Sequence, residues 1–285
     1  MAVTVRAASV RPPVANVVVY PARIGSTARP AREVKMAKSD TVIYGVRAAL
    51  NVAVHRPQAI RRVLFDRQTS KAIGPLLKAT AAQRKPYREA EEEDLRQVAK
   101  TVHHEGVVVV AAPLPFTRID TFIDHLPPDG FVVALDAVNN PHNQGAILRT
   151  AAWFGAAGVV LSTTERHVNS AAIRVSQGGA EMLPCVGVAR LGPVLRRLRE
   201  RGYAVVAADQ NAPQSGFEAP PARPVCLVMG NEAEGLARPV LDLCDRRISI
   251  PGTGAIESLN VSVAAGILMS MVTGPQTSPR PPRAR

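Results

Sequence analysis

The chain has 285 residues, a length that suits two domains of ordinary size better than one or three. Its 46% hydrophobic residues are typical of a globular chain, and 35 basic against 23 acidic residues leave a net charge of +12. This charge predicts a polyanionic partner, either a nucleic acid or an anionic membrane surface. The longest apolar run, residues 106–115, is too short to cross a bilayer, and the 4% aromatic content argues against a surface built on base stacking.

The excess positive charge is concentrated at the two ends of the chain. Residues 1–38 hold seven basic residues against one acidic, and residues 275–285 hold three against none. Both stretches are rich in proline and arginine without lasting periodicity, so we predict flexible basic arms. The arms either contact RNA phosphates without sequence preference or only keep the chain in solution. Residues 129–274 hold twelve basic and twelve acidic residues and are neutral.

Residues 39–113 are predicted to form a small α/β domain. The apolar spacing predicts helices over 42–55, 71–83 and 89–100 and strands over 60–66 and 106–112. Residues 114–130, which contain several prolines, are predicted to be a linker.

Residues 131–274 alternate between short apolar runs and helical patterns. We predict strands over residues 131–135, 157–162, 203–209, 225–230 and 247–250, and helices over 144–155, 170–178, 192–201, 237–243 and 258–272. Continuous apolar strands separated by helices indicate a parallel sheet covered on both faces. Such sheets bind ligands at the carboxyl ends of their strands, which is where the unusual loops fall.

The first unusual loop, residues 140–155, runs into a helix and carries Asn143 and Arg149. Asparagine can both donate and accept hydrogen bonds, and the arginine fork suits a phosphate, although a surface salt bridge would also account for Arg149. The second loop, 229–236, places Gly230 and Glu232 directly after a strand. Glycine there lets the backbone approach a ligand closely, but an ordinary capped turn has the same pattern.

The third loop, residues 250–269, leads through Ile250 into Ser258, Leu259 and Asn260 and then into a helix of small apolar residues. Serine and asparagine are also common helix caps, so this loop alone does not establish a site. The chain lacks a GxGxxG sequence after its first strands, which makes a nicotinamide-dependent oxidoreductase a poor alternative. The three cysteines are widely spaced and form no CxxC pair, so we predict reduced core thiols in a cytoplasmic protein and no metal site.

Taken together, the three loops resemble the signature motifs of the SpoU (TrmH) family of RNA ribose 2′-O-methyltransferases. The family patterns are N-x-G-x-x-x-R-T, G-N/S-E-x-x-G-L and I-P-M-x-G-x-x-x-S-L-N-V-S, and each position is matched here except the methionine, which is Gly252. The match covers residues 130–272. Residues 44–65 and 103–110 also resemble the family's L30e-like substrate-binding domain.

The resemblance implies a fold, a cofactor and a set of roles. The fold would be an α/β catalytic domain whose C-terminus forms a deep trefoil knot, preceded by a small L30e-like α/β domain. The cofactor would be S-adenosylmethionine (AdoMet), held at the positions of Gly230, Ile250 and Leu259. The family builds its active sites across a homodimer, so a dimer is expected. The substrate would be rRNA or tRNA.

The family motif places the catalytic group at Arg149, with the other polar positions orienting it and the ribose. Those positions are Asn143, Glu232, Ser258 and Asn260. A guanidinium with a pKa above about 12 is a poor general base, so the expected role of Arg149 is to bind the neighbouring phosphate and lower the pKa of the hydroxyl. The alternative is a catalytically inactive RNA-binding protein that retains the methyltransferase fold, and the presence of Asn143 and Arg149 argues against it.

Overall fold

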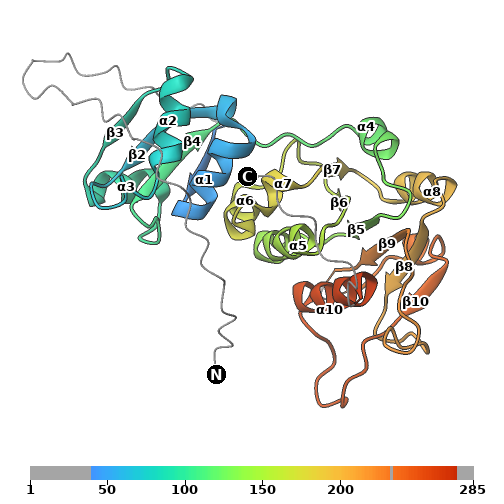
Figure 1. Cartoon of the computed structure of the whole chain (residues 1–285). Coiled ribbons are helices and arrows are strands. Elements are labelled where there is room, and N and C mark those ends of the chain that lie inside the picture. The colour runs from blue at the N-terminus through green and yellow to red at the C-terminus, as the bar shows by residue number, and fades with distance from the viewer. Residues whose placement is uncertain (1–39, 232–233, 275–285) are drawn as a thin grey trace, which may run out of the picture. The chain divides into compact units, whose positions relative to one another are not determined.

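The structure, a computed structural model, describes residues 40–231 and 234–274. Two sheets organise this part of the chain (Figure 1). The predicted basic arms, residues 1–38 and 275–285, lie outside the described residues.

The first sheet has four strands in the order β1-β4-β2-β3. β1 and β2 are antiparallel to β4, and β3 is parallel to β2. The elements are β1 (Thr41–Tyr44), α1 (Val46–His55), a 3-10 turn (Pro57–Ala59), β2 (Ile60–Phe65), α2 (Gly74–Ala82), β3 (Tyr87–Glu89), α3 (Glu92–Ala99) and β4 (Val107–Ala111).

The helix predicted over residues 42–55 is wrong in its first turn. Residues 41–44 form β1, whose residues pair with Val108–Ala111 of β4. Gly45 has a φ of 90°, a conformation open to glycine, and it separates the strand from α1. The helix predicted over 89–100 begins later, at Glu92, because residues 87–89 extend the sheet as β3.

The second sheet has six parallel strands in the order β10-β8-β9-β5-β6-β7. Its elements are α4 (Ile119–Asp124), β5 (Phe131–Leu135), α5 (Pro141–Phe154), β6 (Gly158–Ser162), α6 (Ser170–Ser176), α7 (Gly179–Met182), β7 (Cys185–Val188), α8 (Gly192–Glu200), β8 (Ala204–Ala208), β9 (Val225–Met229), α9 (Arg238–Leu241), β10 (Arg246–Ile248) and α10 (Val261–Thr273). The predicted α/β fold with a parallel sheet is confirmed.

Three elements of this half escape the sequence prediction. α4 lies within the predicted linker, and α7 and β7 lie in residues 179–188, for which no element is predicted. α7 has only four residues and begins with glycine, so its pattern is too short to recognise. Two predicted helices also shift: α5 begins at Pro141 rather than 144, and α10 begins at Val261 rather than 258.

Side chains of the parallel sheet point alternately to two apolar layers. Phe131, Val133 and Leu135 of β5 pack with α5, α6 and α10, whereas Val132 and Ala134 pack with α4 and α8. The first of these layers continues into the first sheet, where it includes residues of β1, α1 and β2. No helix in the described residues is long and apolar enough to cross a membrane.

Candidate active site

A cavity of about 760 Å³ lies at the carboxyl edge of the parallel sheet, beyond the ends of β8, β9 and β10. This volume falls in the range of small-molecule sites. Its apolar walls come from the strand ends and from α10; they include Met229, Leu236, Ile248, Ile250 and Leu268. Its polar groups include the carboxylates of Asp209, Glu234 and Glu257.

Gly230, the first residue after β9, lines this cavity and has no room for a side chain. A Cβ added to it would lie 2.4 Å from the carbonyl carbon of Gly235 and 2.6 Å from the amide nitrogen of Leu236. The second loop folds back on itself at this point, because the Asn231 and Gly235 amides each donate to the carbonyl of the other, at 3.0 and 2.9 Å. Glycine is therefore required at 230 for the loop to close.

The second loop is also tied to the end of β5. The Asn231 side-chain amide donates to the Ala137 carbonyl at 2.8 Å, and the Asn231 side-chain oxygen accepts from the Glu234 amide at 3.2 Å. Ala137 has a φ of 52°, in the left-handed region. These bonds fix the second loop to the segment between β5 and α5, which leads into the first loop.

Asn143 and Asn260 join the first loop to the third. The Asn260 side-chain amide donates to Oδ1 of Asn143 at 3.1 Å. Asn260 is the N-cap of α10, and its side-chain oxygen accepts from the Ser262 amide at 2.9 Å. Asn143 is buried in the first turn of α5, where the loop prediction of residues 140–155 runs into a helix, although the helix begins three residues earlier than predicted. The cap and the pair together hold the starts of α5 and α10 against each other.

Arg149 lies on α5 but outside the lining of the cavity. Its side chain is exposed, and it makes no ion pair or side-chain hydrogen bond with the residues that the structure describes. The surface salt bridge that could have explained Arg149 is therefore not found among residues 40–231 and 234–274.

The remaining predicted residues divide into two groups. Ser258, Leu259 and Ile250 line the cavity together with Gly230, and Leu259 is 42% exposed. Glu232 lies outside the described residues. One copy of the chain thus brings together the predicted cofactor-binding positions and Ser258, while Asn143 and Asn260 form a neighbouring pair and Arg149 stands apart.

Sequence reasoning assigned no role in the site to four residues that contribute to it. Asp209, Gln210 and Asn211 follow β8 and line the cavity. A polar run directly after a predicted strand, at the edge where the other loops gather, was the available signal. Asn231, which stands beside Gly230, holds the second loop in place, and its role depends on a carbonyl distant in sequence.

The cysteines are poor candidates for chemistry. Burial raises the pKa of the Cys185 thiol to about 12 and that of Cys244 to about 11, and it also raises the pKa of Cys226. A thiol must ionise to act as a nucleophile, so none of the three is activated. No group of three or more His, Cys, Asp or Glu side chains in the described part of the chain could hold a metal ion.

Two family models match the chain. Residues 130–270 match the SpoU rRNA Methylase family, and residues 42–117 match the RNA 2′-O ribose methyltransferase substrate binding family. Among curated proteins, the chain is 35% identical over 238 residues to the 23S rRNA (guanosine-2′-O-)-methyltransferase RlmB of Ralstonia nicotianae, covering 82% of this chain and 95% of that protein. It is 33% identical over 230 residues to the uncharacterized tRNA/rRNA methyltransferase YfiF of Escherichia coli O157:H7, covering 81% of this chain and 67% of that protein.

Solved structures agree with these matches. The SpoU methyltransferase AviRb of Streptomyces viridochromogenes, in complex with AdoMet, superposes with a TM-score of 0.69 at 26% identity, covering 82% of this chain and 90% of that one. A putative RNA methyltransferase of the TrmH family from Porphyromonas gingivalis superposes with a TM-score of 0.62 at 26% identity, covering 82% and 89%. The chain therefore belongs to the SpoU family of AdoMet-dependent RNA 2′-O-methyltransferases, and the resemblance drawn from its three loops is confirmed.

Proposed function

We propose that this protein transfers a methyl group from AdoMet to a ribose 2′-hydroxyl of rRNA or tRNA, with rRNA favoured by the relatives named above. The observation that carries the proposal is the meeting of three separate loops around one edge of the parallel sheet. Gly230 and Ser258 line the same cavity, and the Asn143–Asn260 hydrogen bond connects the third loop to the first.

The cavity fits AdoMet in size and chemistry. Gly230, Ile250 and Leu259 would hold the cofactor. The apolar walls of the cavity would contact its adenine, and the absence of a side chain at Gly230 would let the cofactor approach the backbone closely. Carboxylates such as Asp209 can accept hydrogen bonds from its ribose. The bound cofactor supplies an electrophilic methyl group on a sulfonium.

The chain's own task is then to position the ribose and to ease loss of the hydroxyl proton. Arg149 binds the adjacent phosphate and stabilises negative charge on the 2′-oxygen, since its guanidinium stays protonated. Asn143, Asn260 and Ser258 orient the loops and the ribose, and Glu232 is assigned the same role from its motif position.

We further propose that the working unit is a homodimer in which Arg149 reaches the cavity of the second copy. Arg149 does not line the cavity of its own chain. On the same helix Trp153 is 67% exposed, and Val263 of α10 is 50% exposed, so α5 and α10 present apolar surface beside Arg149. A symmetric dimer that buried this surface would bring Arg149 to a second cavity.

The finer features of the fold follow the same proposal. Residues 39–113 would form an L30e-like RNA-binding domain, 114–130 a linker, and 131–274 a catalytic domain closed by a trefoil knot. Residues 1–38 and 275–285 would be basic arms. The protein would act in the cytoplasm.

Gly230→Ala is expected to weaken AdoMet binding by about 5- to 150-fold. The added methyl group would press on the Gly235 backbone, and overpacking of this kind costs about 1–3 kcal/mol. Gly252→Ala is the matched control, since Gly252 lines the same cavity but a Cβ there meets nothing within 4 Å. Isothermal titration calorimetry with AdoMet would measure both variants. Equal affinities for the two would contradict the role given to Gly230.

The function itself is tested by transfer of a tritiated methyl group from AdoMet to unmodified rRNA and tRNA transcripts. Digestion of the product RNA to nucleosides would show whether the label is on the ribose. Label on the 2′-oxygen is expected. Binding of both AdoMet and RNA without transfer to either RNA would overturn the proposal in favour of an inactive RNA-binding protein.

A further inference from the structure

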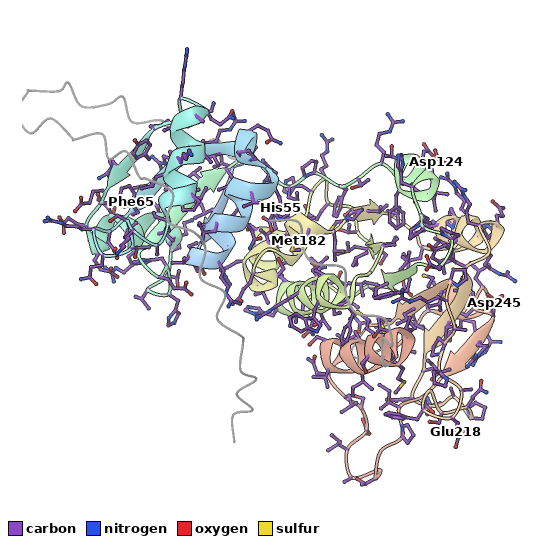
Figure 2. All side chains as sticks on the ribbon, viewed as in Figure 1. His55, Phe65, Asp124, Met182, Glu218 and Asp245 are labelled. Atoms are coloured by element: carbon purple, nitrogen blue, oxygen red, sulfur yellow. The ribbon has the colours of Figure 1, made fainter. Side chains whose placement is uncertain are left out.

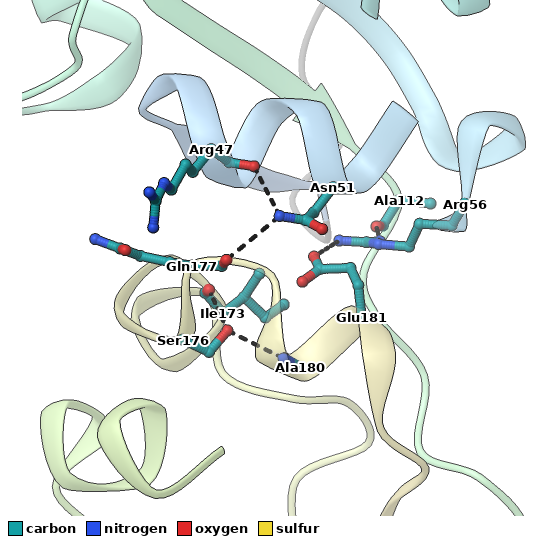
Figure 3. A network of polar contacts seen from close by, with 9 residues as sticks. All are labelled: Arg47, Asn51, Arg56, Ala112, Ile173, Ser176, Gln177, Ala180 and Glu181. Atoms are coloured by element: carbon teal, nitrogen blue, oxygen red, sulfur yellow. Dashed lines mark hydrogen bonds and ion pairs between the residues drawn. The ribbon is translucent and has the colours of Figure 1, made fainter. Parts of the chain in front are cut away.

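The region where α1 of the first sheet meets α6 and α7 of the second is held by a network of polar contacts (Figure 3). The Asn51 side-chain amide donates to the Arg47 carbonyl at 3.0 Å and to the Gln177 carbonyl at 3.3 Å. Gly178 lies so close that a Cβ on it would come within 2.2 Å of the Asn51 amide. The two elements therefore meet in close contact.

Two further contacts extend this region, one between α6 and β1 and the other between α7 and α5. The Arg174 guanidinium of α6 lies 4.8 Å from the centre of the Tyr44 ring of β1, a cation–π distance. Gly179 packs on α5, where its Cβ would lie 2.8 Å from the Cα of Arg149. α1, α6, α7 and α5 thus form a continuous surface, and Arg47 and Gln177 extend from it on the side away from the Arg56–Glu181 pair (Figure 3).

The sequences of α1, α5, α6 and α10 contain neither Asp nor Glu. One acid reaches this surface from outside its helices: the Glu105 carboxylate accepts from the Val46 amide, beside Arg47, at 2.9 Å. The one acid of α7, Glu181, is buried and pairs with Arg56. Within the described residues, Arg47, Arg149 and Arg174 form no ion pair with a carboxylate.

The opposite layer of the parallel sheet is different. Four arginines on α8 and α9, or directly after α8, each pair with an aspartate at 2.8–3.3 Å: Arg197 with Asp120, Arg199 with Asp245, Arg201 with Asp124, and Arg238 with Asp242. Asp124 and Asp245 lie near α8 in Figure 2. Four arginines on that side are thus neutralised by an aspartate, whereas among the described residues Arg47, Arg149 and Arg174 are not.

We propose that Arg47, Arg174, Gln177 and Arg149 form one surface, the junction surface, that binds the phosphates of the RNA strand next to the methylated nucleotide. That the bound strand is RNA rests on the proposed function. Arginine forks match phosphate oxygens, and the Gln177 amide can donate to the sugar or phosphate. A strand whose ribose meets Arg149 must continue across neighbouring elements: α6, which carries Arg174, packs against α5, and α1, which carries Arg47, packs against α6.

The test compares a junction variant with a control variant that removes the same charge. Arg47→Gln/Arg174→Gln is expected to bind unmodified 23S rRNA transcript about tenfold more weakly near 0.1 M salt, and to flatten the slope of log K against log salt by roughly 1.4, the effect of two lost phosphate contacts. Arg201→Gln/Arg238→Gln is expected to bind within about twofold of the wild type. Fluorescence anisotropy over a salt series measures both.

A conservative variant separates charge from folding. Arg47→Lys/Arg174→Lys keeps both charges and is expected to keep most of the salt slope while losing the bidentate geometry. Equal weakening by the junction and control variants would overturn the junction surface, because net charge alone would then explain binding. The junction surface would also be overturned if the Arg47→Gln/Arg174→Gln variant lost binding to anionic phosphatidylglycerol vesicles but still bound RNA as tightly as the wild type.

The outcome also separates this inference from the proposed function. Methyl transfer by the wild type with no effect of the junction variant on RNA binding would refute the junction surface alone. Weakened, salt-sensitive RNA binding by the junction variant, with no methyl transfer by the wild type, would refute the proposed function and leave the surface in place.

Discussion

Arg149→Ala is expected to lower the rate of methyl transfer by about 10²–10³-fold, the usual cost of removing a preorganised group that stabilises charge in a transition state. AdoMet affinity should stay within about twofold, because Arg149 does not line the cavity of its own chain. Arg149→Lys should recover part of the rate by keeping the charge without the fork. Single-turnover assays with tritiated AdoMet measure the rate.

Arg238→Ala is the matched control for Arg149→Ala, since Arg238 is also an exposed helical arginine, and within the described part of the chain it pairs with Asp242. Its rate should equal that of the wild type. Full activity of the Arg149→Ala protein would show that Arg149 has no role in the reaction.

Mixed dimers test whether Arg149 acts on the second copy. Arg149→Ala and Gly230→Ala chains, each of low activity alone when AdoMet is sub-saturating, would be co-expressed with different tags. If Arg149 acts across the dimer, a mixed dimer holds one complete site, and random pairing should restore about a quarter of wild-type activity. If Arg149 served the cavity of its own chain, no mixture would recover activity.

The second large effect concerns the buried ion pair between Arg56, at the end of α1, and Glu181 of α7. Their side chains are 8% and 1% exposed, the charged atoms are 3.4 Å apart, and Arg56 also donates to the Ala112 carbonyl at 2.7 Å. Burial raises the pKa of Glu181 and lowers that of Arg56, so desolvation outweighs the attraction between them. Nε of Arg56 and Oε2 of Glu181 are buried without hydrogen-bond partners among the described residues.

Arg56→Met is therefore expected to lower the free energy of unfolding by about 3–5 kcal/mol, because it leaves Glu181 buried without its partner. The double variant Arg56→Met/Glu181→Leu should lie close to the wild type or above it, since two apolar side chains need no solvation. Urea unfolding followed by circular dichroism compares the three proteins. A double variant as unstable as Arg56→Met would show that the pair itself contributes the stability.

The same variant has an expected dependence on pH. The pKa of Glu181 is already raised from its ordinary value of 4.5 by burial, and loss of the Arg56 charge would raise it further. The folded chain then holds the Glu181 proton more tightly than the unfolded chain. The stability of Arg56→Met should consequently fall as the pH rises above about 4.5. Arg56→Met/Glu181→Gln should lack this dependence. If the stability of both variants fell with pH at the same slope, the dependence would come from a group other than Glu181.

The catalytic half was largely predictable because its signals are local. The strands of the parallel sheet are buried on both faces and appear as short apolar runs, and the loops that follow β5, β9 and β10 contain the motif residues in a contiguous order. Gly230 could be singled out because a strand ends directly before it.

The remainder depended on contacts between distant segments. Residues 41–44 of β1 are stabilised as a strand by pairing with β4, about 65 residues away in the chain, while their apolar spacing also fits a helix. The meeting of Asn51 with Gln177, and of Arg56 with Glu181, joins residues 126 and 125 positions apart. No periodicity in either segment carries information about the other, so neither contact could be foreseen.

The apolar layer shared by the two sheets has a consequence for how the molecule opens. Buried residues of β1, α1 and β2 belong to the same apolar cluster as those of β5, α5 and α10. Local unfolding of the first sheet would therefore expose to solvent the face of the parallel sheet that is covered by α5, the helix that carries Asn143. Amide hydrogens of β4 and of β5 should then exchange with solvent in one cooperative event rather than in two. If RNA binds the first sheet as proposed, it would slow exchange in the catalytic sheet without touching it, and substrate binding would then make the catalytic loops more rigid.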